Sequence, residues 1–207
     1  MPKKSDHKLL LVLAGITLFV LLYVLAAWLY PGGNQLDRHA PGFSWKNNYW
    51  CNLLGEQAIN GMPNRAKPIA IAAMLVLCGS LALFWYLYPK AANLRKGLRL
   101  VIQIAGILAM VTGPLLFTSV NHDMITNLSS AFGVIATGGV LINIYQKKWF
   151  GLLVFGLLNL LLVGLNNYCY YSEVWIIYLP VVQKITFASF LIWFSSITIK
   201  VYRLNEV

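Results

Sequence analysis

Six apolar stretches, each about 20 residues long, divide this chain of 207 residues. A helix needs about 20 mostly apolar residues to cross the hydrocarbon core of a bilayer. Apolar residues make up 59% of the chain and charged residues only 11%, whereas about a quarter of a soluble domain is charged. The sequence therefore predicts an all-α integral membrane protein, a bundle of six transmembrane helices that forms a single domain over residues 1–207. We expect the helices at Leu9–Tyr30, Pro68–Tyr88, Leu100–Val120, Met124–Tyr145, Trp149–Leu165 and Val174–Thr198.

Lysine and arginine lie mostly on one side of these six helices. The side that receives the N-terminus carries eleven of them, whereas the other side carries four, all in the long first connection. Because short cytoplasmic connections are enriched in Lys and Arg, we expect both termini in the cytoplasm and a long extracytoplasmic first loop. The expected location is the bacterial inner (plasma) membrane. No small-residue cleavage site follows the first apolar run, so this helix should be retained and double as the insertion signal.

The net charge of +10 would suggest a nucleic-acid partner in a soluble protein. Here the basic residues lie in short segments between apolar runs, where they set the topology instead. We expect membrane lipids as partners and no nucleic acid, and the sequence leaves the oligomeric state open. It contains no glycine-rich phosphate loop and no paired-cysteine or paired-histidine metal spacing, so we predict no cofactor and no metal site.

Several residues interrupt or cap the predicted helices. Gly113-Pro114 should kink the third helix, because proline removes one backbone donor and clashes with the preceding turn. Asn64 is expected to cap the start of the second helix. In the fourth helix, the small residues Ser129, Gly133 and Thr137 recur every four positions, a pattern typical of a face that another helix approaches closely.

Most acidic and amide side chains fall on the side predicted to be outside: Glu56 in the first loop, His122 and Asp123 at the end of the third helix, Asn127 early in the fourth, and Glu173 before the sixth. Any functional site should therefore lie there. In an intramembrane enzyme, Glu56, His122 and Asp123 would divide the acid, base and orienting roles. Alternatively, these residues only solvate the connections at the water boundary.

Lys184 is the charged residue hardest to explain as a solvated connection. It lies roughly 15 Å into the sixth helix, counted at 1.5 Å per residue, and a lysine within the membrane is costly enough to suggest a functional site. We expect it to face the bundle and pair with an acid. Alternatively, Pro180 begins the helix and leaves Lys184 near the outer interface, where it extends its amine to water. The candidate partners are Asp123, Glu56 and Glu173.

These residues favour a protein that binds or handles a lipid or other amphiphile near the outer leaflet. Lys184, Arg65 or Lys67 would hold an anionic head group, and the loop that carries Trp50 would serve as a lid. The alternatives are an intramembrane lipid-modifying enzyme and a structural or accessory subunit without a site of its own. The candidate ligand-binding residues are Lys184, Arg65, Lys67, Trp50, Glu173 and Asn127.

Cys51 and Cys169 both fall on the predicted outer side. That side is oxidising in a bacterial envelope, so the two residues are candidates for a disulfide. Two cysteines on one side can also be a coincidence. Cys78 lies inside the second helix and is expected to be a packing residue.

Two segments of the first loop resemble a known family. They are Asn48-Tyr49-Trp50-Cys51-Asn52-Leu53-Leu54-Gly55 and Pro63-Asn64-Arg65-Ala66-Lys67-Pro68. This pattern resembles an uncharacterised six-span bacterial family, a domain of unknown function distantly similar to the DRAM and FGF-receptor-activating-protein membrane families. Those relatives commonly show Ser-Asp-x-Gly where this chain has Cys51 to Gly55, so an amide replaces the acid. The resemblance implies a six-helix bundle, and some eukaryotic relatives are linked to glycolipid remodelling or lysosomal membranes.

Overall fold

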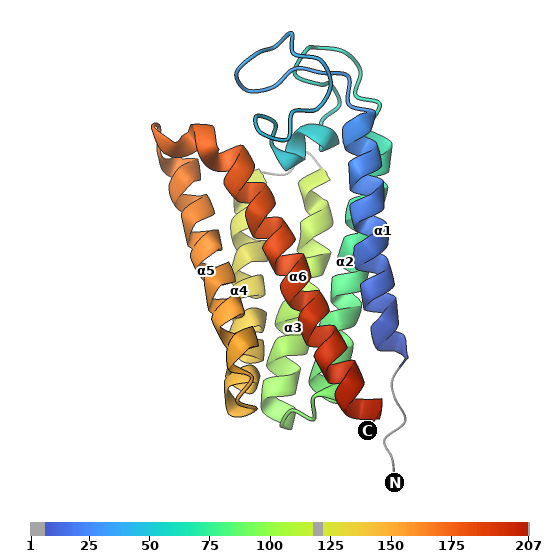
Figure 1. Cartoon of the computed structure of the whole chain (residues 1–207), viewed down its shortest axis with the longest axis vertical. Coiled ribbons are helices and arrows are strands. Elements are labelled where there is room, and N and C mark those ends of the chain that lie inside the picture. Colours follow the sequence, from blue (N-terminus) through green and yellow to red (C-terminus); the bar gives the residue numbers. More distant parts are fainter. Residues whose placement is uncertain (1–6, 118–121, 207) are drawn as a thin grey trace. The chain divides into compact units, whose positions relative to one another are not determined.

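The computed structural model describes residues 7–117 and 122–206, and over these residues the chain is helical, without a named β-strand (Figure 1). The side chains of residues 116–117, 122–123 and 206 lie outside this description. Within it, six helices are long and apolar enough to cross a membrane, which confirms the predicted all-α fold with six helices of that length and composition. The long helices are α1 (Lys8–Trp28), α2 (Lys67–Ala91), α3 (Lys96–Thr112), α4 (His122–Gln146), α5 (Phe150–Tyr171) and α6 (Leu179–Glu206). Short 3₁₀ helices are η1 (Trp50–Leu54), η2 (Gly113–Phe117) and η3 (Trp175–Tyr178).

The third helix changes form at Gly113-Pro114. The α-helix ends at Thr112, and the chain continues as the 3₁₀ helix η2. Because Pro114 has no backbone N–H and its ring crowds the preceding turn, a regular α-helix is disfavoured at this point. The predicted break is therefore present as a change from α to 3₁₀ geometry.

The fifth helix extends six residues beyond the predicted end at Leu165 and ends at Tyr171. Asn166 and Asn167 directly follow the predicted end, and asparagine is common where helices end. Instead, their side-chain amides donate to the carbonyl oxygens one turn earlier, those of Leu162 and Val163, at 3.1 and 3.0 Å. Asparagine bonded in this way to its own helix satisfies its polar group without ending the helix.

The chain divides into two compact units. Unit 1 contains residues 1–18, 74–155 and 193–207, and unit 2 contains residues 19–73 and 156–192. The boundary between the units falls inside helices α1, α2, α5 and α6.

Unit 1 is packed around aromatic residues and a close contact between α3 and α4. Trp85 and Phe194 are buried with their ring centroids 5.2 Å apart. A Cβ on Gly139 would lie only 2.5 Å from Ile102, so a larger residue at position 139 would push α4 away from α3.

Only some residues of the predicted small-residue face of α4 are packed against other side chains. The Ser129 hydroxyl lies 2.6 Å from the Thr112 hydroxyl of α3, and Thr137 is buried. A Cβ on Gly133 would meet nothing within 4 Å. The close approach of the two helices therefore occurs at Gly139, outside the predicted stripe.

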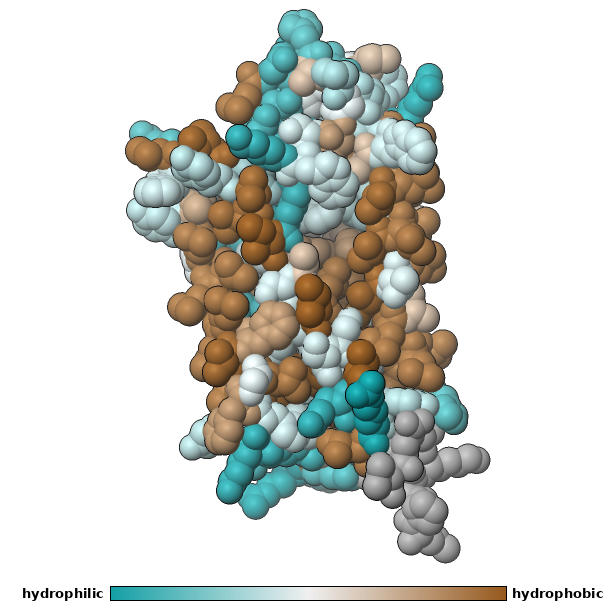
Figure 2. Space-filling model, in the orientation of Figure 1, coloured by the Kyte–Doolittle hydropathy of each residue, from teal (hydrophilic) through white to brown (hydrophobic). Residues whose placement is uncertain are grey.

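Unit 2 contains the first loop, residues 29–66, which is drawn beyond the end of α1 in Figure 1. On the face shown in Figure 2, brown apolar residues cover much of the helices, whereas this loop is drawn largely in teal and pale tones. Large apolar side chains are exposed along the helices, for example Leu21 (63% exposed) and Leu161 (71% exposed). Exposed apolar side chains on helices that are apolar all round are typical of surfaces that face lipid.

Candidate functional site

The first loop is held together by buried asparagine side chains. Asn48 is fully buried; its Nδ2 donates to the carbonyl oxygen of Gly33 at 2.8 Å, and its Oδ1 accepts the Ser44 N–H at 2.8 Å. Gly33 has a φ of +81°, and a Cβ there would lie 2.5 Å from the backbone nitrogen of Asn60. Glycine is therefore required where Asn48 joins the two parts of the loop.

A second buried asparagine joins η1 to the start of α2. The Nδ2 of Asn64 lies within 3.2 Å of three carbonyl oxygens, those of Asn52, Leu53 and Gly55. Its Oδ1 accepts the Ala66 N–H at 3.1 Å, directly before α2, as expected of a capping residue. One side chain thus fixes both the end of η1 and the beginning of α2.

Helix α6 fastens the middle of the loop through two adjacent side chains. The Lys184 ammonium donates to the carbonyl oxygen of Asn48 at 2.5 Å and to that of Pro180, one turn earlier in α6, at 2.8 Å. Gln183 Oε1 accepts the backbone N–H of Trp50 at 3.0 Å. These contacts lie within unit 2, and they bring together Lys184 and Trp50, two of the predicted ligand-binding residues.

Aromatic rings surround this attachment point. The Tyr23 hydroxyl of α1 donates to the Trp50 carbonyl at 3.0 Å, and the two rings are 4.4 Å apart edge to face. The Lys184 Nζ lies 5.6 Å from the ring centroid of Phe43 and 5.9 Å from that of Trp50, within the range of cation–π attraction. We call the set the aromatic cluster: Phe19, Tyr23, Tyr30, Phe43, Trp45, Trp50 and Phe187.

Two hydrogen-bond donors in this cluster have no acceptor within residues 7–117 and 122–206. An ammonium carries three N–H donors, and the contacts of Lys184 account for two. The indole Nε1 of Trp50 is buried without a partner. A half-buried cation and a buried N–H around the same indole ring form an arrangement that suits an anionic or hydrogen-bond-accepting ligand.

Lys184 does not pair with the acids expected of it in the part of the chain that is described. Glu56 forms an ion pair with Lys67 instead, across the junction between the loop and α2. Glu173 is exposed after the end of α5. The expectation that Lys184 pairs with Glu56 is therefore wrong, because the backbone carbonyl of Asn48 takes the place of a carboxylate.

The structure places Pro180 in the first turn of α6, which begins at Leu179. This agrees with the alternative in which Pro180 opens the sixth helix. Lys184 then lies in the second turn, where its amine turns back toward the first loop.

The contacts described above around Lys184 and Trp50 do not include the other predicted site residues. Arg65 is exposed, and Lys67 forms an ion pair with Glu56. Asn127 is exposed on α4, in unit 1. The backbones of His122 and Asp123 begin α4, but their side chains lie outside the described residues.

Cys51 and Cys169 are free thiols in this structure, so the disulfide considered between them is not formed. Cys169 is buried, whereas part of Cys51 is exposed. The protein packed around the Cys51 thiol nevertheless raises its pKa by desolvation, against the opposing effects of a backbone hydrogen bond and the nearby Lys184 charge. A raised pKa keeps the group a thiol at neutral pH, which disfavours Cys51 as a nucleophile.

The residues that build the site around Lys184 are not evident from the sequence. Asn48 and Asn64 belong to the segments that resemble a known family, Asn64 is also a predicted cap, and no pattern in the sequence singles out Gln183. The signal that was available is the density of asparagine in a loop rich in turn residues, since asparagine commonly bonds to nearby backbone in such segments.

The chain matches no family model, no curated protein and no solved structure.

Proposed function

We propose that this protein binds an anionic lipid or similar amphiphile in the aromatic cluster beneath its first loop. The observation that supports the proposal best is the half-buried Lys184 ammonium, which is held by carbonyl oxygens with no carboxylate partner among the described residues. A charge placed out of water is stabilised most by an opposite charge with matching hydrogen bonds. An anionic head group would supply that charge and accept the remaining ammonium N–H and the Trp50 indole N–H.

The proposal includes an orientation. Both termini would be cytoplasmic, and the first loop would face the outside of a bacterial inner membrane, as the distribution of Lys and Arg indicates. The aromatic cluster would then lie at the level of the outer leaflet. Leu36, Trp45 and Met62 of the loop are exposed and would meet the lipid surface there.

A sharp test separates ligand binding from fastening of the loop. Trp50→Phe keeps an aromatic ring and the backbone N–H that donates to Gln183, but it removes the indole N–H. Trp45→Phe is the matched control, because the same change is made on an exposed ring of the cluster. Protein purified in mild detergent is analysed by mass spectrometry for retained phospholipid.

We expect wild-type protein to retain anionic phospholipid in preference to zwitterionic phospholipid. Trp50→Phe should lower that retention about fivefold, the equivalent of one neutral hydrogen bond, while Trp45→Phe leaves it unchanged. Equal retention by the two variants, or no preference for anionic lipid in the wild type, would count against the proposal.

A second candidate is a structural protein in which Lys184 only fastens the loop. The observation in its favour is that Lys184 and Gln183 bind neighbouring parts of the loop backbone. In that case Lys184→Met would lower the thermal stability, and neither tryptophan variant would change the lipid content. An enzyme is less favoured, since Lys67 already neutralises Glu56, one of the three expected catalytic groups.

A further inference from the structure

Unit 1 contains a cavity at the start of α3. Its volume is about 510 Å³, and it is lined by the turn that leads from α2 into α3 and by the end of α4. It lies in a different unit from the aromatic cluster and shares no residue with it. The inference drawn from this cavity therefore does not depend on the proposed function above.

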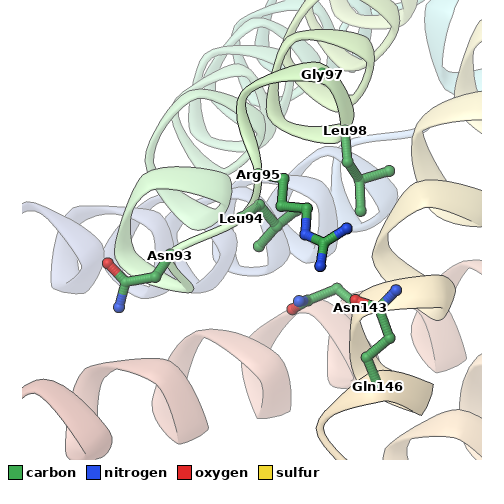
Figure 3. A pocket seen from close by; sticks show the side chains of 7 residues that line it. All are labelled: Asn93, Leu94, Arg95, Gly97, Leu98, Asn143 and Gln146. Carbon is green, nitrogen blue, oxygen red and sulfur yellow. The ribbon is translucent and has the colours of Figure 1, made fainter.

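Hydrogen-bond donors from both of these segments, the turn into α3 and the end of α4, line the cavity. Figure 3 shows the Arg95 guanidinium extending toward the side chains of Asn143 and Gln146 on α4. No hydrogen bond or ion pair of the Arg95 side chain is found within the described residues. An unpaired guanidinium facing two amides provides donors that match the oxygens of a phosphate group.

Asn143 is the buried part of this arrangement. It is only 6% exposed, and its Oδ1 accepts the Tyr88 hydroxyl at 2.9 Å. That bond directs the oxygen toward Tyr88 and leaves the amide NH₂ directed away from it. The NH₂ has no acceptor in the described part of the chain, and Asn143 lines the cavity.

The backbone at the start of α3 adds further donors. At the start of α3, the first backbone N–H that donates within the helix is that of Arg99, which donates to the Arg95 carbonyl at 2.9 Å. No side chain caps the backbone N–H groups that precede it. Gly97 and Leu98, whose amides are among those left uncapped, line the cavity. Free amides at a helix N-terminus, together with the helix dipole, favour an anion.

No acidic residue is among those that line the cavity. The chain has no Asp or Glu at residues 57–122 or 124–172, and these stretches contain every residue that lines the cavity. The first turn of α3 carries no acidic side chain, as is also true of α1, α2, α5 and α6, although a negative side chain stabilises a helix N-terminus. A bound anion would serve the same purpose.

An apolar groove of about 280 Å³ runs along the same two helices. Val101, Ile104 and Leu108 line it from α3, and Phe132 and Ile135 from α4. On α3, these residues follow Gly97 at helical spacing and therefore share its face. An apolar groove suits part of an acyl chain, which makes a phospholipid the expected source of the phosphate.

We propose that Arg95, Asn143, Gln146 and the free amides at the start of α3 form a binding site for a phosphate group. In a membrane this group is the head group of an anionic phospholipid whose acyl chain lies in the adjacent groove. Inorganic phosphate shares the same chemistry and would occupy the same donors.

The test uses the full chain purified in detergent and follows thermal unfolding as ligand is added, since a ligand bound only by the folded state raises the unfolding temperature. One arm adds inorganic phosphate, with chloride at equal ionic strength as the control. The other arm adds phosphatidylglycerol to the micelles, with phosphatidylcholine as the control. Stabilisation in the first arm identifies a soluble phosphate site, and stabilisation in the second arm alone identifies a lipid site.

The variants are Arg95→Gln and Gln146→Glu, both at exposed positions that should not disturb folding. Each should weaken the apparent affinity at least about tenfold, as expected for a hydrogen bond to a charged group. Arg99→Gln is the matched control: it removes the same charge one turn further along α3, outside the cavity lining. Trp50→Phe should leave this binding unchanged.

Stabilisation in neither arm overturns the proposal. So does an equal loss in Arg95→Gln and Arg99→Gln, because general attraction to a basic surface would then explain the binding. A loss confined to Arg95→Gln and Gln146→Glu supports the assigned site, whichever arm shows the stabilisation.

Discussion

The ammonium of Lys184 lies 2.5 Å from the carbonyl oxygen of Asn48, and the side-chain amide of the same asparagine lies 2.8 Å from the carbonyl oxygen of Gly33. A single buried residue thereby connects the sixth helix to the beginning of the first loop. Because Asn48 is fully buried, neither contact can be replaced by water without opening the loop.

Lys184→Met should destabilise the protein by about 2–3 kcal/mol, since it removes the charged donor and leaves the Asn48 carbonyl without its partner. Lys46→Met is the control, because Lys46 is exposed on the same loop and should contribute little. Thermal unfolding in detergent measures both. Adding Glu56→Gln to Lys184→Met should not restore stability, since Glu56 pairs with Lys67. Rescue by Glu56→Gln, or equal effects of the two lysine changes, would contradict this account.

Asn48→Asp should cost about 2–3 kcal/mol, because a carboxylate cannot donate to the Gly33 carbonyl and would be buried beside it. Asn47→Asp makes the same chemical change at the preceding, less buried position and should be close to neutral. The two variants can be compared by thermal unfolding or by protease cleavage within the loop. Cleavage at the wild-type rate in Asn48→Asp would show that this asparagine does not organise the loop.

Tyr88→Phe should destabilise unit 1 by about 1–2 kcal/mol, because the buried Oδ1 of Asn143 loses its donor. Tyr145→Phe removes the same hydroxyl from a side chain that is 63% exposed and should have little effect. Thermal unfolding of both variants provides the comparison. The prediction fails if the two tyrosine variants unfold at the same temperature.

Cys51 should react with a maleimide, whereas the buried Cys169 should not react until the protein unfolds. Because the pKa of Cys51 is raised, its reaction rate should still be increasing with pH above about 8.5, the usual pKa of a free cysteine. Mass spectrometry counts the labels across a pH series. A disulfide between Cys51 and Cys169 would be revealed if both thiols became reactive only after reduction.

The proposed orientation predicts the accessibility of single cysteines introduced into a cysteine-free chain. Lys46→Cys should be labelled by a membrane-impermeant reagent in intact cells, and Lys148→Cys only after the cells are opened. The reason is the excess of Lys and Arg in the connections on the Lys148 side. Labelling of position 148 from outside would reverse the orientation and place the aromatic cluster at the cytoplasmic side.

The helices could be predicted because their signal is local. Long apolar runs specify six helices that are long and apolar enough to cross a membrane, and Pro114 specifies the change to 3₁₀ geometry after α3. The end of α5 could not be predicted, because Asn166 bonds to its own helix instead of ending it. An asparagine can either end a helix or bond to the preceding turn and continue it, and only the neighbouring structure decides which of the two occurs.

The candidate site was predictable only in part. Lys184 could be predicted as a site residue because a charge is rare within an apolar run. That prediction does not require the partner of Lys184 to be known. Its partner is a backbone carbonyl, which every residue carries, so no residue type in the sequence could identify it. The same limit applies to the start of α3, where the donors are amides common to all residues.

The contact between Asn48 and Lys184 joins residues 136 positions apart in the chain. During synthesis the first loop is therefore complete long before its fastening residue has been made. Until the sixth helix is in place, the loop has only its contacts with earlier parts of the chain, among them the hydrogen bonds of Asn48, Asn64 and Tyr23. The fastening of the first loop thus depends on the last helix to be synthesised, and a chain that stops before α6 would carry a folded but unfastened loop.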